Sequence, residues 1–381
     1  MIQKEVTAND ILRWILKITT ANKIPDIHIN TGQQPRIRDH NWEIQILQTI
    51  EVNWVEIRSP RLSREMVADI IKIVVWDKMY LRFEVHLELD CSYQFDWDWD
   101  WEPDRYRVNC YIDSAWLSIA MRIIPSEIPT IDELWLWDSI KKLCKKNKWL
   151  ILVTWPTWSG KSTNLASMID YIAQNNKKHI ITIEDPIEFA FKSWKCLINQ
   201  REIWNSTKWF PEAMKSALRE DPDVIMVWEM RDPETIKAAI TIAETWHLVL
   251  STLHTNDSVQ SIDRMVDTFP SHQQTQIRMQ LSQSLIWVIS QRLLPRKDLD
   301  WRIACREILI MNDAIKNLIM TWKTHQIYSV LEVSFKSWMI LMDKYLTILY
   351  KKWKICKDTL LANTRDKEWM EMLIREEWLE G

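Results

Sequence analysis

Residues 149–163, WLILVTWPTWSGKST, decide the fold of the second half of this 381-residue chain. The apolar run at 149–154 is typical of a strand buried on both faces of a parallel sheet. The loop after it ends in Gly160, Lys161 and Ser162, and an amphipathic helix is predicted over 162–175. A phosphate-binding loop has the same order, because its N–H groups converge on phosphate while the lysine reaches the outer oxygens and the hydroxyl binds Mg²⁺. The short GKST match alone also fits a helix N-terminus capped by serine.

Tryptophan stands in this loop at Trp155 and Trp158, where a phosphate-binding loop normally has glycine. The chain has 3 glycines and 25 tryptophans, whereas average usage of about 7% predicts roughly 27 glycines. Other tryptophans lie in loop-like stretches, namely DWDWDWEPD at 96–104, DLDWR at 298–302 and YKKWKI at 350–355. Glycine adopts positive φ at little cost, whereas tryptophan carries a Cβ and an indole. The pattern favours a glycine-containing parent sequence in which tryptophan has replaced glycine over a fold that is naturally rich in tryptophan.

Composition argues against several classes of protein. The net charge of −3 gives no sign of a nucleic-acid-binding or membrane-surface protein, and the hydrophobic fraction of 47% is ordinary for a globular chain. No run approaches the roughly 18 apolar residues of a membrane-spanning helix, and the N-terminus lacks the apolar core of a signal peptide. The six cysteines have no CxxC spacing, which predicts reduced thiols rather than disulfides or a zinc site.

The order of strand and helix patterns predicts two domains. Residues 1–122 alternate short strand and helix signals, which is typical of a small α+β domain. Residues 123–135 contain two prolines and a polar break and are the predicted linker, and 136–381 form the second domain. In the second domain apolar strands alternate with helices, which predicts an α/β fold with a doubly wound parallel sheet, and the pattern is mostly helical from residue 306. These strands are expected at 149–154, 179–185, 223–229 and 247–254.

Two acidic stretches lie at the ends of predicted strands. IEDPIE at 183–188 places three carboxylates within six residues, which suits the orientation of water or Mg²⁺. DPDVIMVWE at 221–229 is an apolar strand that ends in Glu229, where a carboxylate would meet a metal shell at the carboxyl edge of a parallel sheet. Either stretch alone also fits a helix cap or a solvated turn. Together, and in this order behind a phosphate-binding loop, they favour a nucleotide site.

Residues 149–294 resemble the motor domain of the type IV pilus retraction ATPases, a branch of the secretion ATPase superfamily. The matching blocks are LILVT, GKST, HIITIEDPIEF, KCLINQRE, LREDPDVIMV and HLVLSTLHTN, and most tryptophans inside the matching region stand where that family has glycine. DIHINTGQQPRIR at 26–38 resembles the family's N-terminal PAS-like domain, and AIKNLIM at 314–320 resembles a helical motif of its retraction-type members. The resemblance implies a RecA-like parallel-sheet ATPase core with a smaller α+β domain before it.

The same resemblance implies a function. It identifies the chain as a member of a family of hexameric motors that hydrolyse ATP with Mg²⁺ and drive pilus retraction and twitching motility. The implied partners are further copies of the chain in a homo-hexamer, a platform protein of the inner membrane, and a paralogous motor ATPase, with no nucleic acid. The implied location is cytoplasmic, peripheral to the inner membrane at the pilus base.

The resemblance also implies roles for residues at matching positions. Glu188 would position the attacking water, and Glu229 would support the metal shell together with Ser162. His254 and His247 would contact the nucleotide site, although a hydrogen-bonded core histidine is an equal alternative for His247. The phosphates would be bound by the end of the loop and the first turn of the helix: Ser159, Gly160, Lys161, Ser162 and Thr163.

Two arginines of the first domain, Arg107 and Arg122, match positions that reach the γ-phosphate of a neighbouring subunit. Such an arginine finger stabilises charge in the transition state. The alternative for both arginines is an ordinary surface salt bridge.

The tryptophans predict that this exact chain binds nucleotide poorly. Trp155 and Trp158 lie where N–H groups must approach phosphate, and positive φ at either position would add strain of about 1–3 kcal/mol. Trp228 beside Glu229 and Trp246 beside His247 are expected to crowd the same site.

Three other functions stay open. A type II secretion or pilus assembly ATPase would commonly add a larger N-terminal region and a four-cysteine zinc site. A non-catalytic ring subunit would keep the shape of the motor and lose the chemistry. A nucleic-acid translocase shares the core fold, and the near-neutral charge argues against it.

Overall fold

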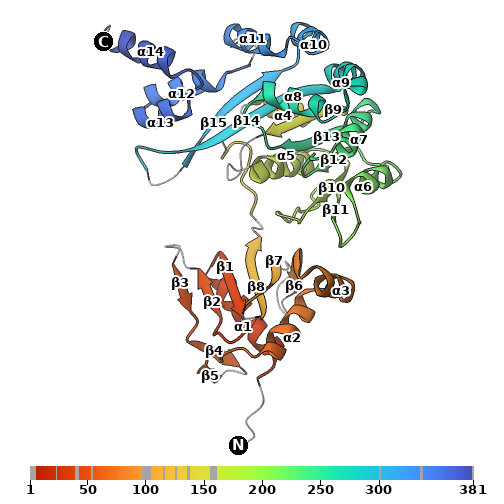
Figure 1. Ribbon diagram of the computed structural model, residues 1–381, viewed down its shortest axis with the longest axis vertical. Helices are drawn as coiled ribbons and strands as arrows, with labels where there is room; N and C mark the ends of the chain where they lie inside the picture. The colour runs from red at the N-terminus through yellow and green to blue at the C-terminus, as the bar shows by residue number, and fades with distance from the viewer. Residues whose placement is uncertain are drawn as a thin grey trace, which may run out of the picture. The chain divides into compact units, whose positions relative to one another are not determined.

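The protein is described by a computed structural model that covers residues 6–22, 24–38, 43–52, 55–96, 104–114, 116–124, 127–134, 138–154, 161–299, 302–334 and 338–379. The chain divides into two compact units (Figure 1). The first unit comprises Met1–Ile128 with Glu184–Phe191 and Arg201–Lys208, and the second comprises Pro129–Ile183, Lys192–Gln200 and Trp209–Gly381. The two short inserts of the first unit come from the region predicted as the second domain. The predicted linker also begins too early, because Ile123 and Ile124 are the last residues of a strand.

The first unit is built on a six-stranded sheet in the order β3-β2-β1-β8-β7-β6, with antiparallel neighbours throughout. Its strands are β1 (Asp26–Asn30), β2 (Arg36–Arg38), β3 (Ile44–Ile46), β6 (Glu88–Phe95), β7 (Asp104–Asp113) and β8 (Trp116–Ile124). A separate pair is formed by β4 (Thr49–Val52) and β5 (Val55–Arg58). The helices are α1 (Ala8–Ala21), α2 (Arg64–Val74) and α3 (Asp77–His86). The predicted small α+β domain is confirmed.

The sheet of the first unit has one apolar and one polar face. Successive side chains of a strand point to opposite faces, so Ile27 and Ile29 of β1 enter the core while Asp26 and His28 lie on the other face. Helix α1 packs on the apolar face with Ile11, Leu12, Ile15 and Leu16, which recur at helical spacing. The polar face is therefore where the charged side chains of this unit gather.

The second unit is built on a seven-stranded sheet in the order β11-β10-β12-β13-β9-β14-β15. The neighbouring strands from β10 to β14 in this order pair in parallel, and β14 pairs antiparallel with β15. Its strands are β9 (Trp149–Thr154), β10 (His179–Glu184), β11 (Leu197–Glu202), β12 (Val224–Val227), β13 (Leu248–Leu253), β14 (Leu285–Pro295) and β15 (Arg302–Ile310). β9, β12 and β13 are apolar and buried, as expected for strands covered on both faces. The predicted α/β fold is confirmed.

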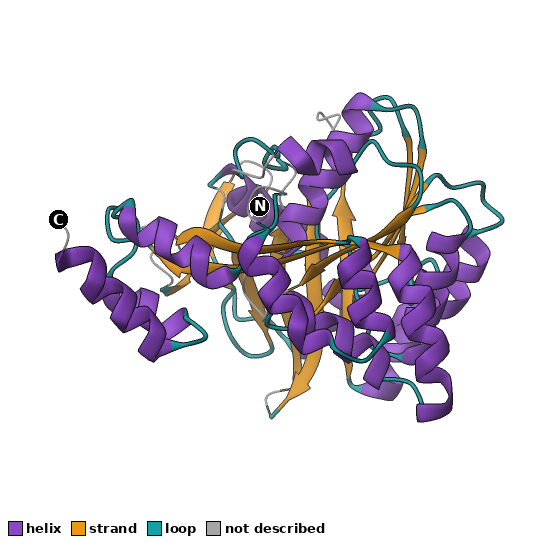
Figure 2. Cartoon of the chain, turned by 90° about the horizontal axis from the view of Figure 1, so that it is seen from above, coloured by secondary structure: helices purple, strands orange, loops and turns teal. Residues whose placement is uncertain are grey.

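Helices cover this sheet, as Figure 2 shows by secondary structure. They are α4 (Asp138–Leu143), α5 (Lys161–Asn175), α6 (Phe210–Ala217), α7 (Pro233–Glu244), α8 (Ser258–Asp267) and α9 (Ser271–Ser284). α7 begins after an N-cap, Asp232, whose side chain accepts from the N–H of Thr235, and α8 begins in the same way at Asp257. The helices predicted at 162–175, 210–219 and 232–245 are confirmed to within two residues at each end.

The C-terminal part is helical except for one stretch. Its elements are α10 (Asp313–Met320), η1 (Thr324–Gln326), α11 (Ile327–Val333), α12 (Met342–Lys351), α13 (Lys357–Asn363) and α14 (Lys367–Leu379). The prediction of a mostly helical chain from residue 306 is wrong for 306–310, which continue β15. A long-range antiparallel partner, β14, makes this stretch a strand.

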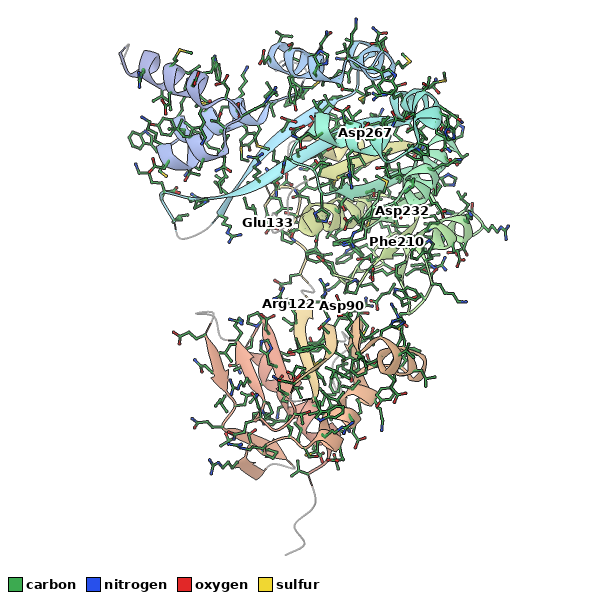
Figure 3. The ribbon with its side chains drawn as sticks, in the orientation of Figure 1. Asp90, Arg122, Glu133, Phe210, Asp232 and Asp267 are labelled. Carbon is green, nitrogen blue, oxygen red and sulfur yellow. The ribbon has the colours of Figure 1, made fainter. Side chains whose placement is uncertain are left out.

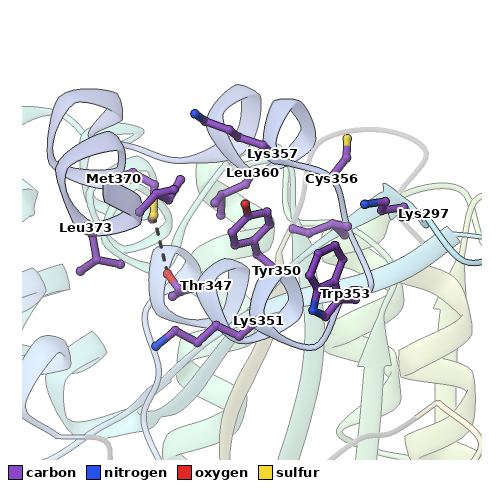
Figure 4. Close-up of a pocket in the computed structure, with 12 residues that line it drawn as sticks. Lys297, Thr347, Tyr350, Lys351, Trp353, Cys356, Lys357, Leu360, Met370 and Leu373 are labelled. Atoms are coloured by element: carbon purple, nitrogen blue, oxygen red, sulfur yellow. Dashed lines mark hydrogen bonds between the residues drawn. The ribbon is translucent and has the colours of Figure 1, made fainter. Parts of the chain in front are cut away.

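Helices α12 to α14 pack around Leu346, Ile355, Leu360 and Met370. They enclose a cavity of about 410 Å³, in which Thr347 Oγ1 lies 3.7 Å from Met370 Sδ (Figure 4). Within the described ranges, no helix is long and apolar enough to cross a membrane.

Candidate nucleotide site

The predicted phosphate-binding stretch lies between β9 and α5, which are the strand and the helix predicted on either side of it. β9 ends at Thr154 and α5 begins at Lys161, with Ser162 and Thr163 half-buried in its first turn. The hydroxyls of Thr154 and Ser290 lie 2.7 Å apart, which ties the end of β9 to β14. The loop itself lies outside the described residues, and so do the predictions for Trp155, Trp158, Ser159 and Gly160 and for the Lys161 side chain.

A second group of functional side chains gathers at the carboxyl ends of β12 and β13. Parallel strands end at one edge of a sheet, and β13 lies between β12 and β9. Glu229 follows β12 and His254 follows β13, and His254 Nε2 lies 3.2 Å from Glu229 Oε1. Arg231 Nη2 lies 2.8 Å from Glu229 Oε2. The structure thus brings Glu229 and His254 together at the edge that leads into the phosphate-binding stretch.

Arg231 was not among the predicted site residues. Its position two residues after Glu229, in the stretch EMRD, was the available signal. A sequence pattern does not indicate which way such a side chain turns, so the pair with Glu229 becomes visible only in the folded chain.

Backbone hydrogen bonds fix the segment that carries Glu229. The N–H of Trp228 donates to the carbonyl of Ile183 in β10 at 2.9 Å, and that of Met230 donates to the carbonyl of Thr252 in β13 at 3.2 Å. The Thr252 hydroxyl donates to the carbonyl of Trp228. The Glu229 side chain is only 10% exposed, so it is a nearly buried carboxylate whose two oxygens each face a basic side chain.

His247 lies elsewhere, and the prediction that it contacts the nucleotide site with His254 is not supported. It precedes β13, so it lies at the amino end of the strand that His254 follows. The six residues of β13 separate the two histidines by roughly 20 Å along the strand. His247 Nδ1 instead lies 3.2 Å from the Thr245 hydroxyl and 3.3 Å from the carbonyl of Ile242, at the end of α7. Trp246 lies at this opposite edge too, so it does not crowd the carboxyl edge as predicted.

Arg107 and Arg122 lie on the polar face of the first unit, directly opposite each other in the β7–β8 pair. Arg107 Nη2 donates to Asp90 Oδ2 at 2.5 Å, and Arg122 Nε donates to Asp26 Oδ1 at 2.6 Å. These hydrogen bonds raise the pKa of both guanidinium groups above the usual range. Figure 3 labels Arg122 and Asp90 on neighbouring parts of this face. A hollow of about 470 Å³ lies over it, lined by both arginines, His28 and Asn109.

Glu188 belongs to the same unit, because the segment 184–191 is one of its inserts. Its Oε1 lies 3.8 Å from Arg107 Nη1, and its N–H donates to Glu184 Oε2 at 3.4 Å. The structure therefore brings Glu188, Arg107 and Arg122 together in the first unit, and Glu229 and His254 together in the second.

A magnesium ion fits the donors of the second unit in a limited way. Mg²⁺ takes oxygen ligands, few of them from protein and the rest from water and phosphate. Ser162 offers a hydroxyl and Glu229 a carboxylate, but both oxygens of Glu229 already face Arg231 and His254. Within the described ranges there is no cluster of three or more metal-binding His, Cys, Asp or Glu side chains. Ser162 would therefore suit Mg²⁺ better as a protein ligand than Glu229.

Comparison with known proteins identifies relatives along most of the chain. Residues 119–329 match the family of type II/IV secretion system proteins. The type IV pilus retractation ATPase PilT of Pseudomonas aeruginosa is 40% identical over 353 residues, which cover 93% of this chain and 96% of the relative. A twitching motility protein of Neisseria gonorrhoeae is 43% identical over 314 residues, 82% of this chain and 83% of the relative. A crystal structure of the pilus retraction motor PilT with bound ADP matches with a TM-score of 0.82 at 40% identity, over 94% of this chain and 98% of that one.

Proposed function

The chain belongs to the type II/IV secretion system protein family, among its pilus retraction ATPases, and from this membership we propose that it is a hexameric motor that hydrolyses ATP to drive type IV pilus retraction. Two relatives, one named for pilus retraction and one for twitching motility, align with this chain over 96% and 83% of their own lengths. The alternatives are an assembly or type II secretion ATPase and a non-catalytic ring subunit, and no observation among the described residues favours either of them.

The observation that carries the proposal is the cluster of Glu229, His254 and Arg231. It lies at the carboxyl edge of β12 and β13, next to the strand whose end leads into the phosphate-binding stretch. Ligands of open α/β sheets bind outside this edge of the strands. A nearly buried carboxylate with a histidine and an arginine on its two oxygens suits the sensing of a phosphate group. Gain or loss of a negative phosphate nearby would change how strongly both basic side chains are attracted to the carboxylate.

The proposed chemistry divides among the remaining predicted residues. Lys161, Ser162 and Thr163, with Ser159 and Gly160, bind the phosphates at the start of α5. Mg²⁺, when bound, neutralises charge on the β- and γ-phosphates. Glu188 orients the attacking water and accepts its proton, as a general base does.

Arg107 and Arg122 are proposed to act on the nucleotide of a neighbouring subunit. Two guanidinium groups on one sheet face, both charged, can stabilise the negative charge that develops on the transferred phosphoryl group. Before a neighbouring nucleotide is engaged, hydrogen bonds to Asp90 and Asp26 orient the two guanidinium groups.

The proposed assembly follows from the same family. Met1–Ile128, with the inserts Glu184–Phe191 and Arg201–Lys208, serves as the N-terminal domain, and the rest of the chain serves as the ATPase domain of each subunit in a homo-hexamer. The ring is proposed to bind a platform protein of the inner membrane from its cytoplasmic side, with a paralogous motor as a further partner and no nucleic acid.

ATP hydrolysis tests the proposal. The chain as written and a Trp155→Gly/Trp158→Gly variant should be compared for ATP affinity and turnover, with Lys161→Ala in the variant as the inactive control. We expect the variant to bind and hydrolyse ATP and the chain as written to do so more weakly. A variant that binds ATP without hydrolysing it would support the non-catalytic ring subunit. Equal ATP affinity and turnover for the chain as written and the variant would contradict the predicted impairment.

A further inference from the structure

The backbone separates the tryptophans of this chain into two kinds. Seven of them have positive φ, whereas only Leu87 and Asp221 do so among the other described non-glycine residues. Positive φ is uncommon for any residue with a Cβ, and it is an outlier for a bulky one. The seven tryptophans lie at φ values between 56° and 109°: Trp116, Trp149, Trp204, Trp246, Trp322, Trp338 and Trp353. Gly32, with φ of 76°, lies in the same range.

Two of these tryptophans end helices in a geometry that selects glycine. After α10, the N–H of Trp322 donates to the carbonyl of Ile319, and the next N–H, of Lys323, donates to Leu318. This pair of bonds is the Schellman motif, in which the residue past the C-cap is left-handed and is usually glycine. Trp322 has φ of 63° at that position.

The end of α12 repeats the motif. The N–H of Trp353 donates to the carbonyl of Tyr350 at 2.8 Å, and that of Lys354 donates to Leu349 at 2.9 Å. Trp353 has φ of 56°. Trp246 follows the C-cap of α7 in the same way, with φ of 70°.

Other positions of the set lie at turns and strand starts. Trp116 follows the tight turn between β7 and β8 with φ of 86°, where a left-handed glycine commonly begins the second strand. Trp204 has φ of 70° and its N–H donates to the carbonyl of Thr207, which closes another turn. Trp149 has φ of 109° at the first residue of β9.

The indoles at these positions do not explain the backbone. Trp246 is 72% exposed, and the indole of Trp322 lies on the surface under the guanidinium of Arg278 at 3.8 Å. A cation–π contact contributes about 0.5–2 kcal/mol, whereas an unfavourable backbone conformation costs about 1–3 kcal/mol. By contrast, Trp14 is 7% exposed in the core of α1 and has no positive φ. Six of the seven indoles lie against a lysine or arginine side chain, but what the seven positions share is the backbone of glycine.

We infer that these seven positions are glycine in the protein made by its own cell, because the codon written here as tryptophan is read there as glycine. The codon UGA, which is read as tryptophan in some genetic codes, differs from the glycine codon GGA by one base. A shared codon explains both the many tryptophans and the 3 glycines of the chain. The inference rests on backbone geometry and composition, so it stands apart from the proposed function.

Peptide sequencing by mass spectrometry of the protein from its own cell is the direct test. We expect glycine at the seven positions, and one codon, UGA, at all of them in the gene. Tryptophan in the peptides, or the codon UGG at these positions, would overturn the inference.

Recombinant chains give a second test that needs neither the native cell nor ATP. The chain as written should be compared with two versions in which the seven tryptophans are all glycine or all alanine. Both versions remove the indoles, but only glycine removes the Cβ that positive φ disfavours. We expect the glycine version to melt higher than the alanine version by about 10 °C, since several strained sites each shift the midpoint by a few degrees.

The alanine version is the matched control, and it keeps the comparison valid if the chain as written does not fold. Equal melting of the glycine and alanine versions would contradict a backbone requirement for glycine. Trp14→Gly in the glycine version should lower the midpoint, because it empties a buried position.

Discussion

Glu188 and Glu229 are both carboxylates proposed to act on the same nucleotide, but the structure places them in different surroundings. Glu229 is 10% exposed, with His254 at 3.2 Å and Arg231 at 2.8 Å from its oxygens. Glu188 is 30% exposed and lies 3.8 Å from Arg107, whose short hydrogen bond goes to Asp90 instead. Glu229 is thus tightly positioned, whereas Glu188 is accessible to solvent.

This difference indicates how the work is divided. A nearly buried carboxylate with two basic partners stabilises its surroundings and has little freedom to take a proton from water. An accessible carboxylate beside a charged arginine can turn towards a water molecule when nucleotide binds. We therefore expect substitutions around Glu188 to change chemistry and substitutions of Glu229 to change stability as well.

The largest effect is expected for Arg107→Ala, in the Trp155→Gly/Trp158→Gly chain. Loss of an arginine finger should lower the rate of ATP hydrolysis by about 10³-fold. Rings mixed from Arg107→Ala and Lys161→Ala subunits should regain part of the activity, because one subunit supplies the arginine and the other the phosphate site. Mixed rings as inactive as either parent would argue against action between subunits.

Glu188→Gln in the same chain should lower hydrolysis by about 10²- to 10³-fold, as expected for loss of a general base. ATP affinity should change by less than about threefold, since a glutamine retains the shape and hydrogen-bonding capacity of the side chain. Single-turnover rates and equilibrium binding separate the two quantities. Equal losses of affinity and rate would assign Glu188 to binding and remove the contrast with Glu229.

Glu229→Gln should destabilise the second unit by about 1.5–3 kcal/mol, because it removes the charge that both His254 and Arg231 face. Urea unfolding measures the effect, with Glu188→Gln and the exposed Glu212→Gln of α6 as matched controls that should change stability by less than about 0.5 kcal/mol. Equal unfolding free energies for all three variants would show that the contacts of Glu229 with His254 and Arg231 do not stabilise the second unit.

A third carboxylate, Glu307 of β15, extends the comparison to complete burial. Its side chain accepts from the N–H and hydroxyl of Ser258, and burial raises its pKa above the ordinary 4.5. Stability from a raised pKa is full below the unfolded value and is lost as pH rises through the folded value. The stability of Glu307→Gln relative to the parent should therefore increase from pH 4.5 to pH 8. Urea unfolding at both pH values checks this small effect, and a constant difference would contradict the raised pKa.

Much of the second unit could be predicted from sequence because its elements are locally specified. The runs at β9, β12 and β13 are apolar at most buried positions, and Asp232 and Asp257 cap the helices that follow. β15 was missed because its strand conformation depends on pairing with β14, which lies outside any local window. The linker was begun two residues early for a similar reason, since the pairing of β8 with β7 extends to Ile124.

The contact between Glu229 and His254 could be predicted from the sequence, whereas the place of His247 could not. Glu229 and His254 follow neighbouring parallel strands, so their order in the sequence already places them at one edge. His247 has the same residue type and lies in the same stretch, HLVLSTLHTN, but it precedes β13 and lies at the other edge. Direction along a strand, and not distance in sequence, decides which of the two histidines meets Glu229.

The sequence by itself determined the fold class and the family and predicted a phosphate-binding stretch, because these depend on hydrophobic periodicity and on motifs of consecutive residues. It also indicated that tryptophan stands in place of glycine. Only the tertiary structure decided which carboxylate is nearly buried, that Arg231 joins Glu229, and that Glu188 lies with Arg107. Burial and ion pairing depend on side chains that are distant in sequence, and φ depends on the hydrogen bonds that close each turn, so neither can be read from the order of residues alone.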